Sequence, residues 1–236
     1  ANEELTRSNA ELKQFAYVAS HDLQEPLRSI SGFSALLAKR YQGKLDADAD
    51  EYIHYMTEAV ARMQRMITDL LDYSRIDARA KPFERCEMKA VAASALSNLR
   101  ATLEELAAEV SLDDDLPQVQ GDAPLLAQVL QNLIGNAVKF HGTAAPRVHL
   151  SARREAGTWC FRIRDNGIGI AAADCEKIFQ IFTRLHSRDR YPGTGIGLAA
   201  CKRIIERHHG RIWAEPNPDG AGTSVYFTLP AQEAVI

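Results

Sequence analysis

Residues 131–140 read QNLIGNAVKF and lie in a predicted helix, Ala123–Lys139. Asn132, Asn136 and Lys139 are spaced i, i+4 and i+7, which places them on one face of that helix. The two amides offer oxygen ligands to a hard cation such as Mg²⁺, and the ammonium offers positive charge to phosphates. An ordinary polar helix face has the same spacing, so this segment alone leaves both interpretations open.

Two glycine-rich segments follow this helix. The first, Asp165–Ile170, reads DNGIGI at the end of a predicted strand. Its glycines allow close approach to the backbone and its carboxylate can accept a hydrogen bond from an exocyclic amine, although a simple Asn-Gly turn is the alternative. The second, Gly193–Leu198, reads GTGIGL and leads into a helix, so its backbone N–H groups can face an anion such as a triphosphate. It is not a Walker loop, because no Gly-Lys-Ser/Thr follows, and it lacks the strand–helix–strand setting of a dinucleotide site.

A pair of phenylalanines lies between the two glycine segments. Phe179 and Phe182 occur in IFQIFTR, residues 178–184, a spacing that is also common in a plain core. The polar stretch Leu185–Tyr191 that follows is interpreted as a mobile lid. Each of these patterns is unspecific alone, but together and in this order they indicate a nucleotide site.

Helices and strands are mixed in the last two thirds of the chain. Helices are predicted at Met88–Ala108, at Ala123–Lys139, and from Gly195 to about His209, where Gly210 is expected to act as the cap. Strands are predicted at Val148–Arg153, Trp159–Arg164, Arg211–Ala214 and Ser224–Leu229. This order predicts an α+β fold, with helices packed on one mixed sheet as an α/β sandwich.

The first 76 residues have helical periodicity throughout. One apolar stripe consists of Leu12, Phe15, Ala19, Leu23, Pro26, Ile30, Phe33 and Leu37. A second consists of Tyr52, Met56, Ala59, Met63, Ile67, Leu70 and Ser74. The polar break at Tyr41–Asp46 predicts an antiparallel helical hairpin. Because a lone hairpin buries only one side of each stripe, we expect two hairpins to form a four-helix bundle as a homodimer.

His21 lies on the opposite side of the first helix from its apolar stripe, so we expect the imidazole to face solvent. Position alone fits a merely solvated histidine equally well. However, Asp22 can orient the ring or accept its proton, and Glu25 lies one turn later on nearly the same face. Pro26 removes a helical hydrogen bond and is expected to kink the helix there, which indicates a movable site. His54 has no such neighbours and is interpreted as solvated surface.

The composition argues against several classes of protein. Lys and Arg total 28 against 31 Asp and Glu, a formal net charge of −3, which gives no reason to expect nucleic acid as a partner. No apolar run approaches the roughly 18 residues that a membrane span needs, and no secretory signal opens the chain. The four cysteines form no CxxC pair and predict reduced thiols in a cytoplasmic protein. These are Cys86, Cys160, Cys175 and Cys201.

With these motifs the chain resembles the sensor histidine kinases of bacterial two-component systems, from about Asn9 to Pro230. Phe15–Arg28, which reads FAYVASHDLQEPLR, is similar to the family's phosphoacceptor box and especially to that of phytochrome-like and PAS-linked kinases. The segments that resemble the N box, first glycine box, F box, second glycine box and closing glycine element are Gln131–Phe140, Asp165–Ile170, Phe179–Phe182, Gly193–Leu198 and Gly220–Thr223.

The resemblance implies a domain organisation and a fold. Residues 1–78 are expected to form the hairpin for dimerisation and histidine phosphotransfer, residues 79–84 a linker, and residues 85–232 a catalytic ATP-binding domain. The implied fold of that domain is the Bergerat-type α/β sandwich, which agrees with the order of predicted elements.

The resemblance also implies roles for individual residues. His21 is the expected phosphorylated nucleophile, Asp22 the base or orienting carboxylate, and Asn136 a catalytic residue that binds Mg²⁺. Asp165 is expected to bind the adenine amino group of ATP. The nucleotide-binding set is Asn132, Asn136, Lys139, Asp165, Gly167, Gly169, Phe182, Gly193, Thr194, Gly195, Gly197, Leu198 and Thr223. Positioning and charge neutralisation supply most of phosphoryl-transfer catalysis, so this set is chemically sensible.

The implied partner is a separate response regulator, whose receiver domain takes the phosphoryl group on an aspartate. The chain opens without a methionine within a helical pattern, so we expect it to be part of a longer protein with an N-terminal sensor domain. Glu25 stands where family members with phosphatase activity carry Thr or Asn, and weak phosphatase activity is therefore predicted. The alternatives are a Bergerat-type ATPase, which lacks the hairpin with an exposed His-Asp pair, and a catalytically silent dimerising scaffold.

Overall fold

The computed structural model describes residues 23–78, 81–185, 191 and 193–231. The chain divides into two compact units, Ala1–Ala78 and Arg79–Ile236, which are called the first unit and the second unit below. His21 and Asp22 lie outside the described residues. The described part contains no helix that is long and apolar enough to cross a membrane.

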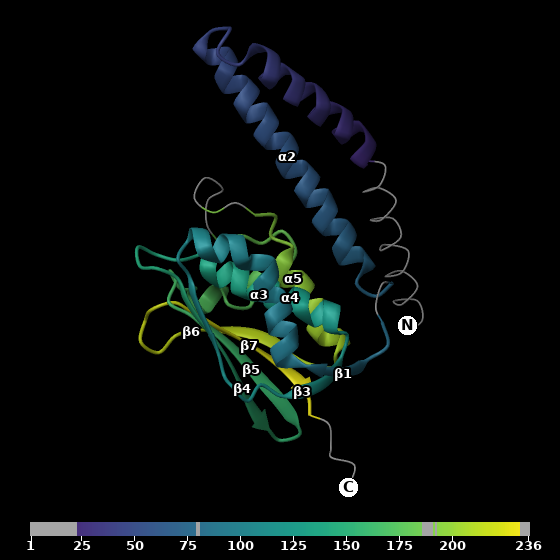
Figure 1. Ribbon diagram of the computed structural model, residues 1–236, viewed down its shortest axis with the longest axis vertical. Coiled ribbons are helices and arrows are strands. Elements are labelled where there is room, and N and C mark those ends of the chain that lie inside the picture. The colour runs from purple at the N-terminus through teal and green to yellow at the C-terminus, as the bar shows by residue number, and fades with distance from the viewer. Residues whose placement is uncertain (1–22, 79–80, 186–190, 192, 232–236) are drawn as a thin grey trace. The chain divides into compact units, whose positions relative to one another are not determined.

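The first unit is the predicted helical hairpin. A helix over residues 23–41 is followed by α2, Ala47–Arg75 (Figure 1). Asp46 caps α2 because its side chain accepts a hydrogen bond of 2.9 Å from Ala49 N. Gly43 takes a left-handed φ of 74° in the turn, and its N–H lies 2.9 Å from both carboxylate oxygens of Asp50.

The apolar stripes of the hairpin are largely exposed in the single chain. Leu27 is buried on the first helix, and Ile53, Val60 and Leu71 are buried on α2, none of which belongs to the two predicted stripes. The described residues of the first stripe are exposed, and Phe33 keeps 70% of its surface accessible. In the second stripe Tyr52 and Met63 are exposed and the other residues are half-buried. Exposed apolar side chains of this unit are Leu23, Ile30, Phe33, Leu36, Leu37, Tyr41, Leu45, Tyr52, Tyr55 and Met63.

The second unit contains a mixed five-stranded sheet of order β2-β4-β5-β7-β6. Its strands are β2 (Glu109–Leu112), β4 (Arg147–Glu155), β5 (Thr158–Asp165), β6 (Ile212–Pro216) and β7 (Thr223–Pro230). The β2–β4 pair is parallel and the other pairs are antiparallel. β1 (Glu84–Glu87) and β3 (Gln118–Gly121) form a separate antiparallel ribbon.

Three helices cover one face of the larger sheet (Figure 1). They are α3 (Met88–Glu105), α4 (Ala123–Lys139) and α5 (Gly197–Arg207). Alternate residues of the central strands point at them, so Phe161 of β5 and Phe227 of β7 pair in register and stack with centroids 4.8 Å apart. Ile134 of α4 and Ile204 of α5 are fully buried in the same layer. This two-layer arrangement is the predicted sandwich.

Most predicted elements are confirmed, and α4 has the predicted bounds. α3 ends at Glu105, three residues before the predicted end. The predicted cap of α5 is wrong, because His209 takes the left-handed conformation with φ 59°. Gly210 is needed for a different reason: a Cβ on it would lie 1.8 Å from the Thr228 carbonyl oxygen. The short strands β1, β2 and β3 and two 3₁₀ turns, Ala172–Asp174 and Lys177–Phe179, were not predicted.

Candidate nucleotide-binding site

The polar face of α4 carries three of the predicted site residues. Asp122 starts this helix by accepting a 3.3 Å hydrogen bond from Leu125 N, and Pro124 lies in its first turn. One face is buried against α3, α5 and the sheet, which leaves the face of Asn132, Asn136 and Lys139 half-buried. The spacing that the sequence indicated is therefore present as one continuous face.

The two asparagines on this face have different surroundings. Asn132 packs against α5, because its Nδ2 donates a 3.5 Å hydrogen bond to Gly197 O. On α5, Cys201 is fully buried, and its thiol donates to Val129 O at 3.9 Å. Burial raises the pKa of that thiol to about 12, so it is a neutral packing group. The side chain of Asn136, by contrast, makes no hydrogen bond within the described residues, and its amide is available to a ligand.

Lys139 lies beside the second glycine box. Its Nζ is 2.9 Å from the position that a Cβ on Gly193 would occupy, and 4.6 Å from the centroid of the Phe140 ring. Burial lowers the pKa of Lys139, and the positive charge of Arg184 lowers it further. Among the described residues Lys139 has no acidic partner, so an anion bound here would favour its charged form.

Arg184 is a functional candidate that the sequence analysis did not identify. Its guanidinium donates hydrogen bonds of 2.6 Å to Gly193 O and 2.7 Å to Tyr191 O. It is held by backbone carbonyls and makes no ion pair in the part of the chain that the structure describes. A single arginine after the F box has no periodicity or spacing that marks it, so no sequence pattern identifies it. Lys139 and Arg184 together make the Gly193 region electropositive.

Asp165, at the end of β5, is the acidic residue of the site. Its Oδ1 accepts hydrogen bonds from Gly167 N (2.8 Å) and Thr223 N (3.1 Å). Burial raises the pKa of this carboxyl, and the two N–H donors oppose that rise. Its Oδ2 accepts no hydrogen bond among the described residues, so it can take a donor from a ligand.

Asn217 holds the backbone of Asp165 and was not predicted as a site residue. It is 4% exposed, and its Nδ2 donates to Asp165 O at 2.8 Å and to Ala221 O at 2.6 Å. Its Oδ1 accepts a 2.7 Å hydrogen bond from Ser224 Oγ. In sequence, Asn217 stands in an N-P-D-G stretch that only indicates a turn.

The glycines of the site are fixed by close backbone packing. A Cβ on Gly167 would lie 2.5 Å from Phe140 O, which also accepts a 2.9 Å hydrogen bond from Ile168 N. A Cβ on Gly222 would lie 2.2 Å from Asp165 O. Gly169 has a φ of 76° and lies against Gly222. The first glycine box is thereby packed between the end of α4 and the closing glycine element.

The F box joins the second glycine box. Phe182 N donates a 2.9 Å hydrogen bond to Gly195 O, and a Cβ on Gly195, whose φ is 78°, would lie 2.9 Å from Phe182 C. Phe179 is buried, which fits the core interpretation, whereas Phe182 is 52% exposed with a φ of 65°.

The remaining predicted residues have different positions. Thr223 is 3% exposed and contributes its backbone N–H to Asp165, while Thr194 and Leu198 are half-buried near the start of α5. Most of the predicted lid, residues 186–190, lies outside the described residues. All four cysteines are free and buried, as predicted for reduced thiols.

The donor set fits a magnesium ion that is held mainly by its ligand. The described residues contain no group of three or more His, Cys, Asp or Glu side chains that could hold a metal. Mg²⁺ commonly keeps waters and substrate phosphates and takes only one or two protein ligands. The uncommitted amide of Asn136 can supply one such oxygen.

Comparisons with known proteins match both parts of the chain. Residues 11–79 match the His Kinase A (phospho-acceptor) domain, and residues 121–233 match the histidine kinase-, DNA gyrase B-, and HSP90-like ATPases. Over 227 residues the chain is 50% identical to cyanobacterial phytochrome A of Nostoc sp. strain PCC 7120. That alignment covers 96% of this chain and 29% of the phytochrome, so the chain spans less than a third of that relative.

Solved structures share the fold. One is the crystal structure of full-length ShkA in complex with AMPPNP, which aligns with a TM-score of 0.69 and 25% sequence identity. The alignment covers 94% of this chain and 47% of the ShkA chain. Another is histidine kinase ThkA in complex with the response regulator protein TrrA, with a TM-score of 0.62 and 22% sequence identity. That alignment covers 98% of this chain and 65% of the matched chain. The second unit therefore has the Bergerat-type fold that the sequence predicted.

Proposed function

Because the chain belongs to the sensor histidine kinase family, we propose that it uses ATP to phosphorylate His21 and passes the phosphoryl group to an aspartate of a response regulator. One observation carries the nucleotide part of this proposal. Within the described residues, Asp165 of the first glycine box keeps one carboxylate oxygen without a donor, and Lys139 and Arg184 lie beside Gly193 of the second glycine box without an acidic partner. The amino group of adenine is complementary to the carboxylate, and the phosphate chain of ATP is complementary to the two cations.

The base of the nucleotide pairs with Asp165. Its Oδ1 is occupied by the N–H groups of Gly167 and Thr223, so Oδ2 accepts from the exocyclic amine of adenine. Asn217 fixes the backbone of Asp165, which orients the carboxylate before the ligand arrives. Gly167, Gly169 and the closing glycine element shape the backbone around the base.

The phosphates bind beside the second glycine box, near Lys139 at the end of α4. The ammonium of Lys139 and the guanidinium of Arg184 supply positive charge beside Gly193, and the start of α5 at Gly197 supplies backbone N–H groups. Asn132 holds α4 to α5 at this point. Asn136 would hold Mg²⁺ through its amide oxygen, and the metal would neutralise phosphate charge and orient the γ-phosphoryl group.

The phosphoryl transfer occurs on the hairpin. A neutral ring nitrogen of His21 attacks the γ-phosphorus, so that an N–P bond forms while the bond to the β–γ bridging oxygen breaks and ADP leaves. Asp22 accepts or orients the proton of the other ring nitrogen. The response regulator aspartate then attacks the same phosphorus, which forms an acyl phosphate and regenerates the imidazole. Both residues fall within the segment that matches the phospho-acceptor family.

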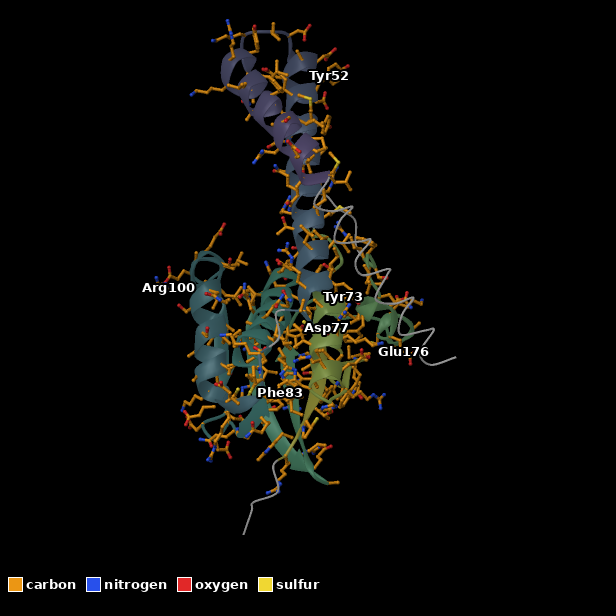
Figure 2. The ribbon with its side chains drawn as sticks, turned by 90° about the vertical axis from the view of Figure 1, so that its right-hand side faces the viewer. Tyr52, Tyr73, Asp77, Phe83, Arg100 and Glu176 are labelled. Carbon is orange, nitrogen blue, oxygen red and sulfur yellow. The ribbon has the colours of Figure 1, made fainter. Side chains whose placement is uncertain are left out.

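The hairpin works as a homodimer in this proposal. Ile30, Phe33 and Leu37 on one helix and Tyr52 and Met63 on α2 are exposed in the single chain (Tyr52 is labelled in Figure 2). Exposed apolar side chains on a two-helix hairpin are stable in water when a second copy covers them. Packing of two hairpins gives the four-helix bundle expected from the sequence.

The test is phosphorylation with γ-labelled ATP and Mg²⁺, in the protein and in His21→Ala and His54→Ala variants. His54 is an exposed histidine of the same hairpin and serves as the matched control. We expect label that survives alkali, is lost in acid, persists in His54→Ala and vanishes in His21→Ala. Adding a receiver domain should then remove the label from the kinase. ATP hydrolysis without a His21-dependent label would instead indicate an ATPase, and bound ATP with no turnover a scaffold.

A further inference from the structure

The segment just before β1 is bound to the rest of the second unit by specific contacts. Lys81 N donates a 2.7 Å hydrogen bond to Asp122 Oδ2, 41 positions away. Asp122 is 3% exposed, and its other carboxylate oxygen caps α4 through Leu125 N. A buried carboxylate that accepts two backbone N–H groups binds them strongly, because both bonds are charge-assisted.

Phe83 is fastened beside it, on the ring of His208. The two rings stack with centroids 4.6 Å apart and planes 12° apart, and the Arg207 guanidinium lies 5.5 Å from the Phe83 centroid. Phe83, labelled in Figure 2, lies among the side chains of the second unit. The contact therefore holds residues 81–83 from two sides, by a hydrogen bond and by an aromatic stack.

His208 is a rigid support for this stack. It is 1% exposed, its Nε2 accepts a 2.9 Å hydrogen bond from Asp122 N, and its Nδ1–H donates to Ile204 O at 2.7 Å. A Cβ on Gly121 would lie 3.0 Å from His208 Cδ2, so a larger residue there would displace the ring. Lys81, Phe83, Asp122 and His208 form one connected cluster, which is called the linker anchor below.

The linker anchor lies apart from the nucleotide residues. It joins the first turn of α4 to the end of α5, whereas Lys139 is the last residue of α4 and Gly197 the first of α5. Loss of Phe83 therefore leaves the groups that bind ATP in place, and it releases only the segment before β1. That separation allows a test in which ATP binding is the internal control.

We propose that Phe83, together with Asp122, is a positioning residue for autophosphorylation, because the linker anchor shortens the connection between the two units. Four residues, 77–80, separate the buried Ile76 from Lys81; without the linker anchor, seven residues, 77–83, separate Ile76 from β1. The effective concentration of a tethered group falls roughly as the −3/2 power of tether length, so lengthening from four to seven residues lowers it about twofold. This inference rests on the proposed transfer to His21.

The test compares Phe83→Leu, Phe83→Tyr and Asp122→Asn in the full chain. At position 83, Leu keeps apolar volume without the ring, and Tyr keeps the ring. At position 122, Asn can still cap α4, but it has only one oxygen to accept the hydrogen bonds that the two carboxylate oxygens accept. Tyr226→Leu is the matched control, because it removes a ring stacked 5.2 Å from Trp213 elsewhere in the same unit. A three-residue insertion, Gly-Ser-Gly, between Ala80 and Lys81 lengthens the tether while keeping the linker anchor.

Each variant is assayed for the rate of His21 labelling at saturating ATP, for the KM for ATP, for the Kd for ATP, and for hydrogen exchange of the Lys81 amide. We expect Phe83→Leu and the insertion to lower the maximal rate by about twofold or more with KM and Kd unchanged. Phe83→Tyr and Tyr226→Leu should keep the parental rate. Lys81 should exchange slowly in the parent and in the insertion, and faster in Asp122→Asn and Phe83→Leu.

Three results would overturn the inference. These are a parental rate in Phe83→Leu, an equal loss in Tyr226→Leu, or a fall in ATP affinity that accounts for the loss of rate. ATP binding without any His21 label in the parent protein would overturn the proposed function itself. A labelled parent with an unchanged Phe83→Leu rate overturns the positioning role alone.

Discussion

The side chain of Asn217 donates a 2.8 Å hydrogen bond to the backbone oxygen of Asp165, 52 positions earlier in the chain. Asn217 also bonds Ala221 O and Ser224 Oγ, so one buried amide connects the end of β5, the turn after β6 and the start of β7. The backbone of Asp165, the proposed adenine ligand, is therefore set by a residue that does not itself contact the nucleotide in the proposed function.

Replacing Asn217 with Ala should lower both stability and nucleotide affinity. Three polar partners lose their bonds, and one of them, Ser224 Oγ, is buried; an unsatisfied buried group costs about 1–3 kcal/mol, so we expect a loss of about that size in the free energy of unfolding. Urea unfolding measures this, with Asn98→Ala as control because Asn98 is exposed and, within the described part of the chain, bonds only Gln131. Equal stability of the two variants would contradict the role assigned to Asn217.

Replacing Asp165 with Asn should separate stability from binding. The amide oxygen of Asn can keep both bonds from Gly167 N and Thr223 N, while its NH₂ group presents a donor where Oδ2 presented an acceptor. Loss of a bond to a charged group is worth about 1.5–3 kcal/mol, so ATP affinity should fall roughly 10- to 100-fold. The melting temperature should stay equal or rise, because burial disfavours the charged carboxylate. Titration calorimetry with ATP and a thermal melt measure the two quantities, and a parental Kd would exclude Asp165 as the adenine ligand.

Acidification should weaken binding of the base through the same carboxyl. Burial raises the pKa of Asp165, so on acidification its carboxylate becomes protonated at a higher pH than that of an ordinary aspartate. The ionised form accepts from the amine, hence affinity is present above the raised pKa and lost as pH falls through it. The folding contribution has the opposite sign: a carboxyl whose pKa is raised in the folded state stabilises the fold at low pH and loses this contribution as pH rises. Adenosine is the suitable ligand because it has no titrating phosphate, and Asp165→Asn should remove the pH dependence.

The sequence predicts those parts of the fold that local patterns specify. The bounds of α4 follow from the Asp122 cap, Pro124 and a continuous apolar period, and Asp165 stands at a glycine-marked strand end. The strands β1 and β3 have four residues each, too few for a period, and pair with each other across 30 positions. Arg184 acquires its role through carbonyls seven and nine positions later, and Asn217 through the backbone of Asp165, 52 positions earlier. No periodicity in the sequence records these contacts. The hairpin stripes are predictable, but the residues that pack within one chain, such as Ile53 and Val60, lie beside those stripes.

Gly210 should tolerate no side chain. A Cβ there would lie 1.8 Å from Thr228 O and 2.9 Å from Ile205 Cγ2, so the α5–β6 turn would have to move away from β7. Inserting an atom into a tightly packed site costs up to about 3 kcal/mol, so Gly210→Ala should lower the free energy of unfolding by about that amount. Gly142→Ala is the control, since nothing lies within 4 Å of its added Cβ. If both variants unfold at the same urea concentration, the close approach of Gly210 to Thr228 is wrong.

Replacing Lys139 with Met should weaken the binding of phosphates and leave the base unaffected. Met keeps the apolar stem that packs near Phe140 and removes only the ammonium beside Gly193. The ammonium is already disfavoured by burial and by Arg184, both of which lower its pKa, so its loss should cost no stability in the free protein. A charge-assisted contact to phosphate is worth about 1.5–3 kcal/mol, which predicts an ATP affinity roughly 10- to 100-fold lower with adenosine affinity unchanged. Lys202→Met removes an exposed lysine of α5 and should change neither ligand's Kd. A parallel fall for ATP and adenosine would show that Lys139 supports the structure of the site rather than the charge of the nucleotide.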